Sequence, residues 1–170
     1  MQSEQQKRHN WQTKKLGEIS DAEIKNRLRL ALGFLIKNDG FLLDHAVHER
    51  SISHKLAEYL QDQFPDWHVD CEYNKHGLSK KELPRKCAGK QENLVYPDIN
   101  DHHRNTNDNL LVFEIKPYNT TPVDECDEAK LIKFTRSKGE YHYRLGIFIG
   151  FGRLGEPLIV WYRDGTKTTL

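Results

Sequence analysis

Residues 97–117, PDINDHHRNTNDNLLVFEIKP, contain two strand patterns separated by a turn. The turn segment 104–108, RNTND, is rich in Asn and Asp, whose side chains favour turns. It joins VYPDINDHH (95–103) to NLLVFEIK (109–116), in which both alternating sets of side chains are largely apolar. A strand that is apolar on both faces is typical of the centre of a sheet. The stretch therefore predicts a β-hairpin whose second strand is central.

Charged side chains gather where this hairpin ends. Counting outward from the turn pairs His102 with Leu110 and Asp98 with Glu114. Glu114 and Lys116 are two residues apart, so they point to one face of the strand. An E-x-K pair taken alone is more often a surface salt bridge than a catalytic pair.

Two carboxylates that face each other in a partly buried site repel, and a divalent cation relieves that repulsion. Hard oxygen donors suit Mg²⁺ or Mn²⁺ better than zinc. A lysine beside such a metal can hold a water, help to deprotonate it, or stabilise charge on a phosphate. The hairpin end is therefore a candidate metal site.

Two helices are predicted before the hairpin. In the first, at 20–40, Ser20 and Glu23 form a capping box and Gly40 is placed to end the helix. The second occupies 44–64, with Asp44 as its N-cap. Glu49 comes three residues before the apolar face begins at Ile52, so we expect it on or beside the inward face.

The remaining elements complete a mixed α/β chain. Strands are predicted at 67–74, 143–152 and 156–165, and a further helix at 123–138. The order of helices and strands favours a mixed sheet flanked by helices. We expect a polar, flexible segment at 1–19 and a single domain at 20–170.

Composition excludes several classes of protein. The 170 residues carry a formal net charge of +1, so a nucleic-acid partner would have to be met by a local basic patch. No apolar stretch is long enough to span a bilayer and the N-terminus lacks the apolar core of a signal peptide, so we expect a cytoplasmic protein with no membrane partner. Cys71, Cys87 and Cys126 lack a C-x-x-C spacing, which favours free thiols over disulfides or a zinc site.

Four motifs in a fixed order resemble the PD-(D/E)XK nuclease superfamily, which has the restriction-endonuclease-like fold. They are ERSISHKLAEYL (49–60), VDCEYN (69–74), PDINDHHR (97–104) and NLLVFEIK (109–116). The chain is most similar to short prokaryotic members, and the likeness extends from residue 45 to about 152. The motifs are short, so their order carries the resemblance. It implies a mixed β-sheet of four to five strands flanked by α-helices, with an extra N-terminal helix.

The resemblance also implies a site. Asp98 and Glu114 would ligate Mg²⁺, for which Mn²⁺ can substitute, and the carbonyl oxygen of Ile115 would be a third ligand. Lys116 would position or activate the attacking water. Glu49 would match a helical glutamate that stands near the metal, through water or at a second metal position. Glu72 is a weaker match, with a solvent-facing residue on an edge strand as an equal alternative.

The implied reaction is hydrolysis of phosphodiester bonds by an endo- or exonuclease, with DNA as the leading substrate. Within the basic loop at 74–94, residues 75–90 are the leading phosphate-binding segment, with a solubilising loop as an equal alternative. Lys130 and Tyr143 are weaker phosphate-contact candidates: a solvated lysine and a strand end are the competing interpretations. The proposed nucleic-acid-binding residues are Lys75, Lys80, Lys81, Arg85, Lys86, Lys130 and Tyr143.

Two other functions remain open at this point. The chain could be a catalytically inactive nucleic-acid-binding or interaction protein on the same fold, or a ribonuclease. The sequence shows no helix-turn-helix or zinc-finger pattern that would indicate sequence-specific recognition. It leaves the oligomeric state open, a homodimer included.

Overall fold

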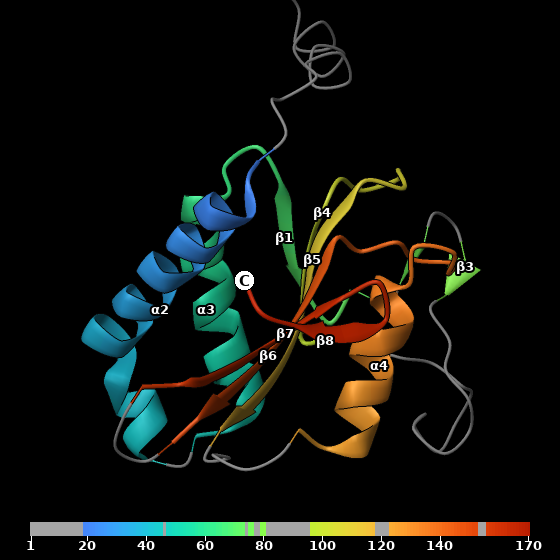
Figure 1. Ribbon diagram of the computed structural model, residues 1–170. Helices are drawn as coiled ribbons and strands as arrows, with labels where there is room; N and C mark the ends of the chain where they lie inside the picture. The colour runs from blue at the N-terminus through green and yellow to red at the C-terminus, as the bar shows by residue number, and fades with distance from the viewer. Residues whose placement is uncertain are drawn as a thin grey trace, which may run out of the picture.

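The computed structural model describes residues 19–45, 47–73, 75–76, 79–80, 96–117, 123–152 and 156–170, and of 75–76 and 79–80 only the backbone. In this part of the chain, three helices accompany a six-stranded mixed sheet and a separate two-stranded one (Figure 1). The helices are α2 (Asp21–Asp44), α3 (Glu49–Gln63) and α4 (Glu125–Thr135). The large sheet contains β1 (His68–Cys71), β4 (Ile99–His102), β5 (Asn109–Pro117), β6 (Leu145–Phe151), β7 (Leu158–Arg163) and β8 (Thr166–Thr168).

The mixed α/β class predicted from the sequence is confirmed, and the sheet is wider than expected. Its strand order is β1-β4-β5-β6-β7-β8, with every neighbouring pair antiparallel except β5 and β6, which are parallel and are joined through α4. The short strand β8 was not predicted. The central position of β5 is confirmed, since residues 110–115 are at most 3% exposed.

The register of the hairpin follows the prediction except beside the turn. Ile99 pairs with Phe113 and Asp101 with Leu111, which continues outward to bring Asp98 beside Glu114. A bulge between Asp101 and His102 shifts the last pair, so that His102 faces Asn109 instead of Leu110. The predicted juxtaposition of the two acidic side chains is therefore retained.

Helices cover both faces of the sheet (Figure 1). Leu111, Phe113 and Ile115 of β5 belong to the larger core cluster, which they form with residues of α2 and α3. Val112 belongs to the second cluster, together with Leu131 and Phe134 of α4. Because side chains alternate along a strand, Glu114 and Lys116 share the face of Val112 and point toward α4.

The end of α2 and the start of α3 differ from the prediction. Ser20 caps α2 as expected, its side chain accepting a hydrogen bond from the Glu23 amide at 3.2 Å. Gly40 does not end α2: the backbone leaves helical geometry at Asp39 (φ −123°) and the helix resumes to Asp44. This extra turn packs Leu42 and Leu43 against the core, which explains why it forms. Asp44 consequently ends α2, and His48 caps α3.

Two further expectations need correction. The loop predicted at 74–94 contains a short hairpin, β2 (Lys75–His76) with β3 (Ser79–Lys80). Cys71 is a free cysteine, but Cys126 is disulfide-bonded, so the prediction of free thiols is wrong for Cys126. Residues 1–18, which make up most of the segment predicted to be flexible, lie outside the described residues. So do residues 81–95, which include Cys87. None of the helices described is long and apolar enough to cross a membrane.

Candidate active site

Three of the predicted catalytic side chains are held in place by the backbone of β5 and its neighbours. Glu114 and Lys116 project from β5, and Asp98 stands just before β4. One carboxylate oxygen of Asp98 accepts a hydrogen bond from the Ile115 amide at 2.6 Å, which fixes Asp98 across the strand from Glu114. Glu49, the first residue of α3, reaches the ammonium of Lys116 at 3.2 Å. The structure thus brings the four residues together.

Two lysines, one of them unexpected at this place, neutralise the acidic side chains. The Lys130 ammonium of α4 lies 2.6 Å from Glu114 Oε2 and 3.1 Å from Asp127 Oδ1. The Lys116 ammonium lies 3.3 Å from Asp127 Oδ2 in addition to its contact with Glu49. The expected alternative of a solvated Lys130 is wrong, because its side chain is mostly buried in these ion pairs.

Burial and mutual repulsion perturb the two acidic groups. Burial raises the pKa of Asp98 to about 7; the Ile115 amide and the two lysines oppose this shift, and the charge of Glu49 adds to it. Glu114 is fully buried, and burial followed by the charge of Asp98 holds its pKa well above the usual range, against the attraction of Lys130. Among the described residues, Glu114 Oε1 has no hydrogen-bond partner. The positive charge near the pair therefore does not fully offset the burial and mutual repulsion of its ionised form.

The lysines of the site stay charged. Burial disfavours the ammonium of Lys116, but the charges of Asp127 and Glu49 outweigh burial and raise its pKa. For Lys130, too, burial is outweighed by Glu114 and Asp127, and its pKa is raised. A lysine with a raised pKa donates hydrogen bonds and stabilises negative charge, and it is poorly suited to removing a proton.

The donor set fits a hard divalent cation that keeps much of its water. Mg²⁺ in proteins is commonly held by one or two carboxylates, with water and substrate phosphate completing its shell. Asp98 and Glu114 supply two such carboxylates, and the buried Oε1 of Glu114 is without a partner in the described chain. No group of three or more His, Cys, Asp or Glu side chains placed to hold a metal occurs in the described residues. A ligand role for the Ile115 carbonyl stays a prediction.

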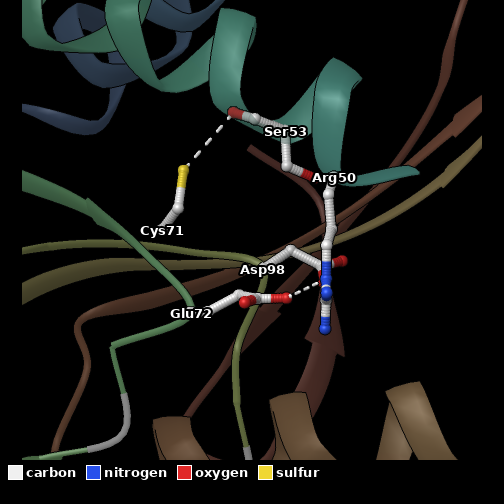
Figure 2. Close-up of a pocket in the computed structure, with 5 residues that line it drawn as sticks. All are labelled: Arg50, Ser53, Cys71, Glu72 and Asp98. Atoms are coloured by element: carbon white, nitrogen blue, oxygen red, sulfur yellow. Dashed lines mark hydrogen bonds and ion pairs between the residues drawn. The ribbon is translucent and has the colours of Figure 1, made fainter. Parts of the chain in front are cut away.

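Asp98 also lines a pocket of about 90 Å³ with Arg50, Ser53, Cys71 and Glu72 (Figure 2). Arg50 Nε donates to Glu72 Oε1 at 2.7 Å, and both side chains are well exposed. The Cys71 thiol donates to the Ser53 carbonyl at 3.7 Å, and burial with the nearby carboxylates raises its pKa to about 11. The thiol is therefore a poor nucleophile at neutral pH.

Glu72 lies at this pocket, beyond the end of β1, and adopts a left-handed backbone conformation with φ of 49°. Its amide donates to the Asp98 carbonyl at 3.2 Å, while its carboxylate binds Arg50. Of the two interpretations of Glu72, the solvent-facing one describes its side chain here. Glu72 is connected to the site only by the hydrogen bond from its backbone amide to Asp98, as far as the described residues show.

Only some of the predicted nucleic-acid-binding residues belong to the described part of the chain. Tyr143 is 2% exposed, and its hydroxyl accepts a hydrogen bond from Asn100 Nδ2 at 2.6 Å inside the core beneath α4. The prediction that Tyr143 contacts a nucleic acid directly is therefore wrong. Of the basic loop, Lys81, Arg85 and Lys86 lie outside the described residues, and Lys75 and Lys80 are described by their backbone alone.

Sequence reasoning missed Asp127, whose side chain is 5% exposed and touches both lysines of the site. A signal was available: Asp127 and Lys130 are three residues apart on a predicted helix, so they share one face. That helix follows the E-x-K strand and must return across the sheet. The same reasoning would have placed Lys130 toward the acidic side chains.

Comparison of the chain with protein-family models, with curated proteins and with solved structures finds no match.

Proposed function

We propose that this chain is a metal-dependent nuclease that hydrolyses phosphodiester bonds, with DNA as its leading substrate. The observation that carries the proposal is the convergence of Asp98 and Glu114 with the charged ammonium of Lys116 at the end of a central strand. Two acidic groups that repel each other in a buried setting need a cation, and a phosphodiester substrate needs positive charge around its transition state.

The topology supports the restriction-endonuclease-like fold that the motif order implies. β5 lies between the antiparallel strand β4 and the parallel strand β6, and α4 crosses between β5 and β6. This arrangement puts the acidic residue of one strand beside the E-x-K end of the next, and it presents a helix on each side. The proposed fold thereby explains why residues 18 positions apart, Asp98 and Lys116, serve one site.

The roles follow from the geometry. Asp98 and Glu114 would hold a Mg²⁺ ion, which when bound would lower the pKa of a water and offset charge on the phosphate. Lys116 donates hydrogen bonds to the water or to a phosphate oxygen, because its ammonium stays charged. Glu49 orients that ammonium from α3 at 3.2 Å. The proposed roles concern the phosphodiester group and not the ribose or deoxyribose attached to it, so RNA is tested beside DNA.

The test is a cleavage assay with supercoiled plasmid, linear duplex, single strands and RNA, in Mg²⁺, Mn²⁺ or EDTA. We expect cleavage that requires the metal and is lost in Glu114→Gln. Lys116→Ala should retain metal and nucleic-acid binding but lose roughly a hundredfold in the single-turnover rate, the scale of a positioned electrostatic group. Lys116→Arg should recover little, because a planar guanidinium cannot replace the compact ammonium.

Lys55→Ala is the matched control, because Lys55 is also a lysine in an ion pair but binds Glu58 on the surface of α3. It should cleave at the wild-type rate. Nucleic-acid binding without turnover in any metal would favour the inactive binding protein. Cleavage by Lys116→Ala at the wild-type rate would show that Lys116 is only a strand-end ion-pair partner, and the proposed site would lose its most specific residue.

A further inference from the structure

α4 extends the site beyond the residues of the sequence motif. Its first two turns place Asp127 and Lys130 over the end of β5, on the face of the sheet that carries Glu114 and Lys116. Negative side chains are favourable in the first turn of a helix, because they face the partly positive amide end. The carboxylate of Asp127 is nevertheless almost wholly buried, which requires compensation by cations.

Asp127 bridges the two lysines. Its Oδ1 lies 3.1 Å from the Lys130 ammonium and its Oδ2 lies 3.3 Å from that of Lys116. Lys130 and Lys116 in turn contact acidic residues at the two ends, so that charges alternate through the site. The complete chain of ion pairs runs Glu114, Lys130, Asp127, Lys116, Glu49.

The two contacts of Asp127 differ in kind. Oδ1 makes a hydrogen bond with Lys130, whereas Oδ2, among the described residues, makes none, so its attraction to Lys116 is that of opposite charges. Lys130 keeps Glu114 at 2.6 Å as a second partner. Among the described residues, Lys116 has the partly exposed Glu49 as its ion-pair partner besides Asp127. Removing the charge of Asp127 therefore releases Lys116 more than Lys130.

We propose that Asp127 is a positioning residue that holds the Lys116 ammonium toward the Asp98–Glu114 pair. A lysine side chain has four rotatable bonds, so an ammonium between strand and helix needs an anion on each side to stay in one place. Glu49 is the anion from α3, and Asp127 is the anion from α4. The inference rests on the proposed nuclease function for its effect on rate, and on the ion-pair geometry alone for the placement of Lys116.

The test uses a double-mutant cycle of Asp127→Asn and Lys116→Ala, with Glu128→Gln as control. Glu128 follows Asp127 on the same helix but binds Tyr162 and Lys167. At saturating metal, Asp127→Asn should lower the single-turnover rate of duplex cleavage roughly ten- to a hundredfold, with less than about a threefold change in nucleic-acid affinity. Combined with Lys116→Ala it should cause no more than about a twofold further loss.

Other outcomes overturn the inference. An Asp127→Asn rate equal to that of Glu128→Gln, rate losses that multiply in the double variant, or a loss confined to affinity would each show that Asp127 does not act through Lys116. Asp127→Glu, which keeps the charge, should cleave within about fivefold of the wild type. A collapse as deep as that of Asp127→Asn would mean that shape, not charge, matters at this position.

A second readout separates this inference from the proposed function. Urea denaturation of the same four proteins should show midpoint shifts of the single variants that exceed, in sum, the shift of the double variant. Shifts that simply add would overturn the placement of Lys116 by Asp127, whatever the substrate. Coupled shifts in a protein that cleaves none of the nucleic acids would uphold the placement and reject the nuclease.

Discussion

Replacing Asp98 with asparagine should make the metal-free protein less sensitive to pH between 5 and 8. Burial raises the pKa of Asp98 from its ordinary value of 3.8 to about 7. Between these two values the folded protein holds a proton on Asp98 that the unfolded chain releases. The unfolded chain therefore binds fewer protons, and the free energy of unfolding falls as pH rises through this interval.

The magnitude follows from the two pKa values. With a folded pKa of about 7 and an unfolded pKa of 3.8, the Asp98 contribution drops by about 2.5 kcal/mol from pH 5 to pH 8. Asparagine has nearly the same shape and can still accept the Ile115 amide, but it carries no charge. It also removes the largest repulsion on Glu114, whose own raised pKa contributes to the slope in the same direction.

The assay is urea denaturation of wild type and Asp98→Asn at pH 5, 6, 7 and 8, with EDTA to exclude metals. Subtracting the two curves cancels the histidines and all other groups that titrate alike in both proteins. We expect the wild type to lose about 2.5 kcal/mol more than the variant over this range. Parallel curves would refute the conclusion that the Asp98 carboxyl is buried and repelled in the folded protein.

Mg²⁺ should reverse the wild-type trend, because it binds ionised carboxylates and therefore binds more tightly at higher pH. Ten millimolar is about the highest concentration needed for a weak site, and the gain in stability follows from mass action. Asp98→Asn should gain much less. An equal gain in both proteins would mean that the ion binds elsewhere.

Three further perturbations test neighbouring features. Lys130→Gln removes a cation 2.6 Å from Glu114, so Mg²⁺ affinity measured by isothermal titration calorimetry should rise roughly tenfold, and a fall would contradict the charge argument. Gly146→Ala brings a Cβ to 3.0 Å from a Thr135 methyl, so chemical denaturation should show a loss of about 1–3 kcal/mol, and an unchanged midpoint would refute the close packing of β6 under α4. Cys71, whose pKa is raised to about 11, should react with iodoacetamide at pH 8 at least about tenfold more slowly than a free cysteine model, with Cys71→Ser as the control for label.

The hairpin and its central strand could be predicted because their signals are local. A turn segment fixes where two strands begin to pair, and a strand that is apolar on both faces has to be covered on both. The bulge could not be predicted, because it depends on how the turn closes. The His103 amide binds the Asp108 carbonyl at 2.9 Å, one residue earlier than the pairing predicted for His103. His102 then faces Asn109, and the bulge leaves Leu110 of β5 as the extra residue between the two pairs.

The prediction of the boundary between α2 and α3 failed for a different reason. Glycine is a frequent helix end, but it ends a helix only when nothing beyond it gains by staying helical. Leu42 and Leu43 gain contacts with the core in an added turn, and a change of direction at Asp39 makes this possible. Such tertiary contacts are invisible to a search for local helix signals. The motif residues Asp98, Glu114 and Lys116 were found because their spacing is set within one hairpin.

A perturbed carboxylate is by itself weak support for an active site, and Asp101 of β4 shows why. It is fully buried, neither of its oxygens has a hydrogen-bond partner in the described chain, and burial holds its pKa well above the usual range. Yet Asp101 pairs with Leu111 on the α2–α3 side of the sheet, where, among the described residues, the charge of Arg27 opposes the shift. Its perturbation comes from burial, which a protein can tolerate by keeping the group protonated. Glu114 differs because a second carboxylate, Asp98, adds repulsion while Lys130 adds attraction at 2.6 Å. It is this opposition of like and unlike charges in one buried place, and not burial alone, that supports the proposed cation and phosphate as partners of the site.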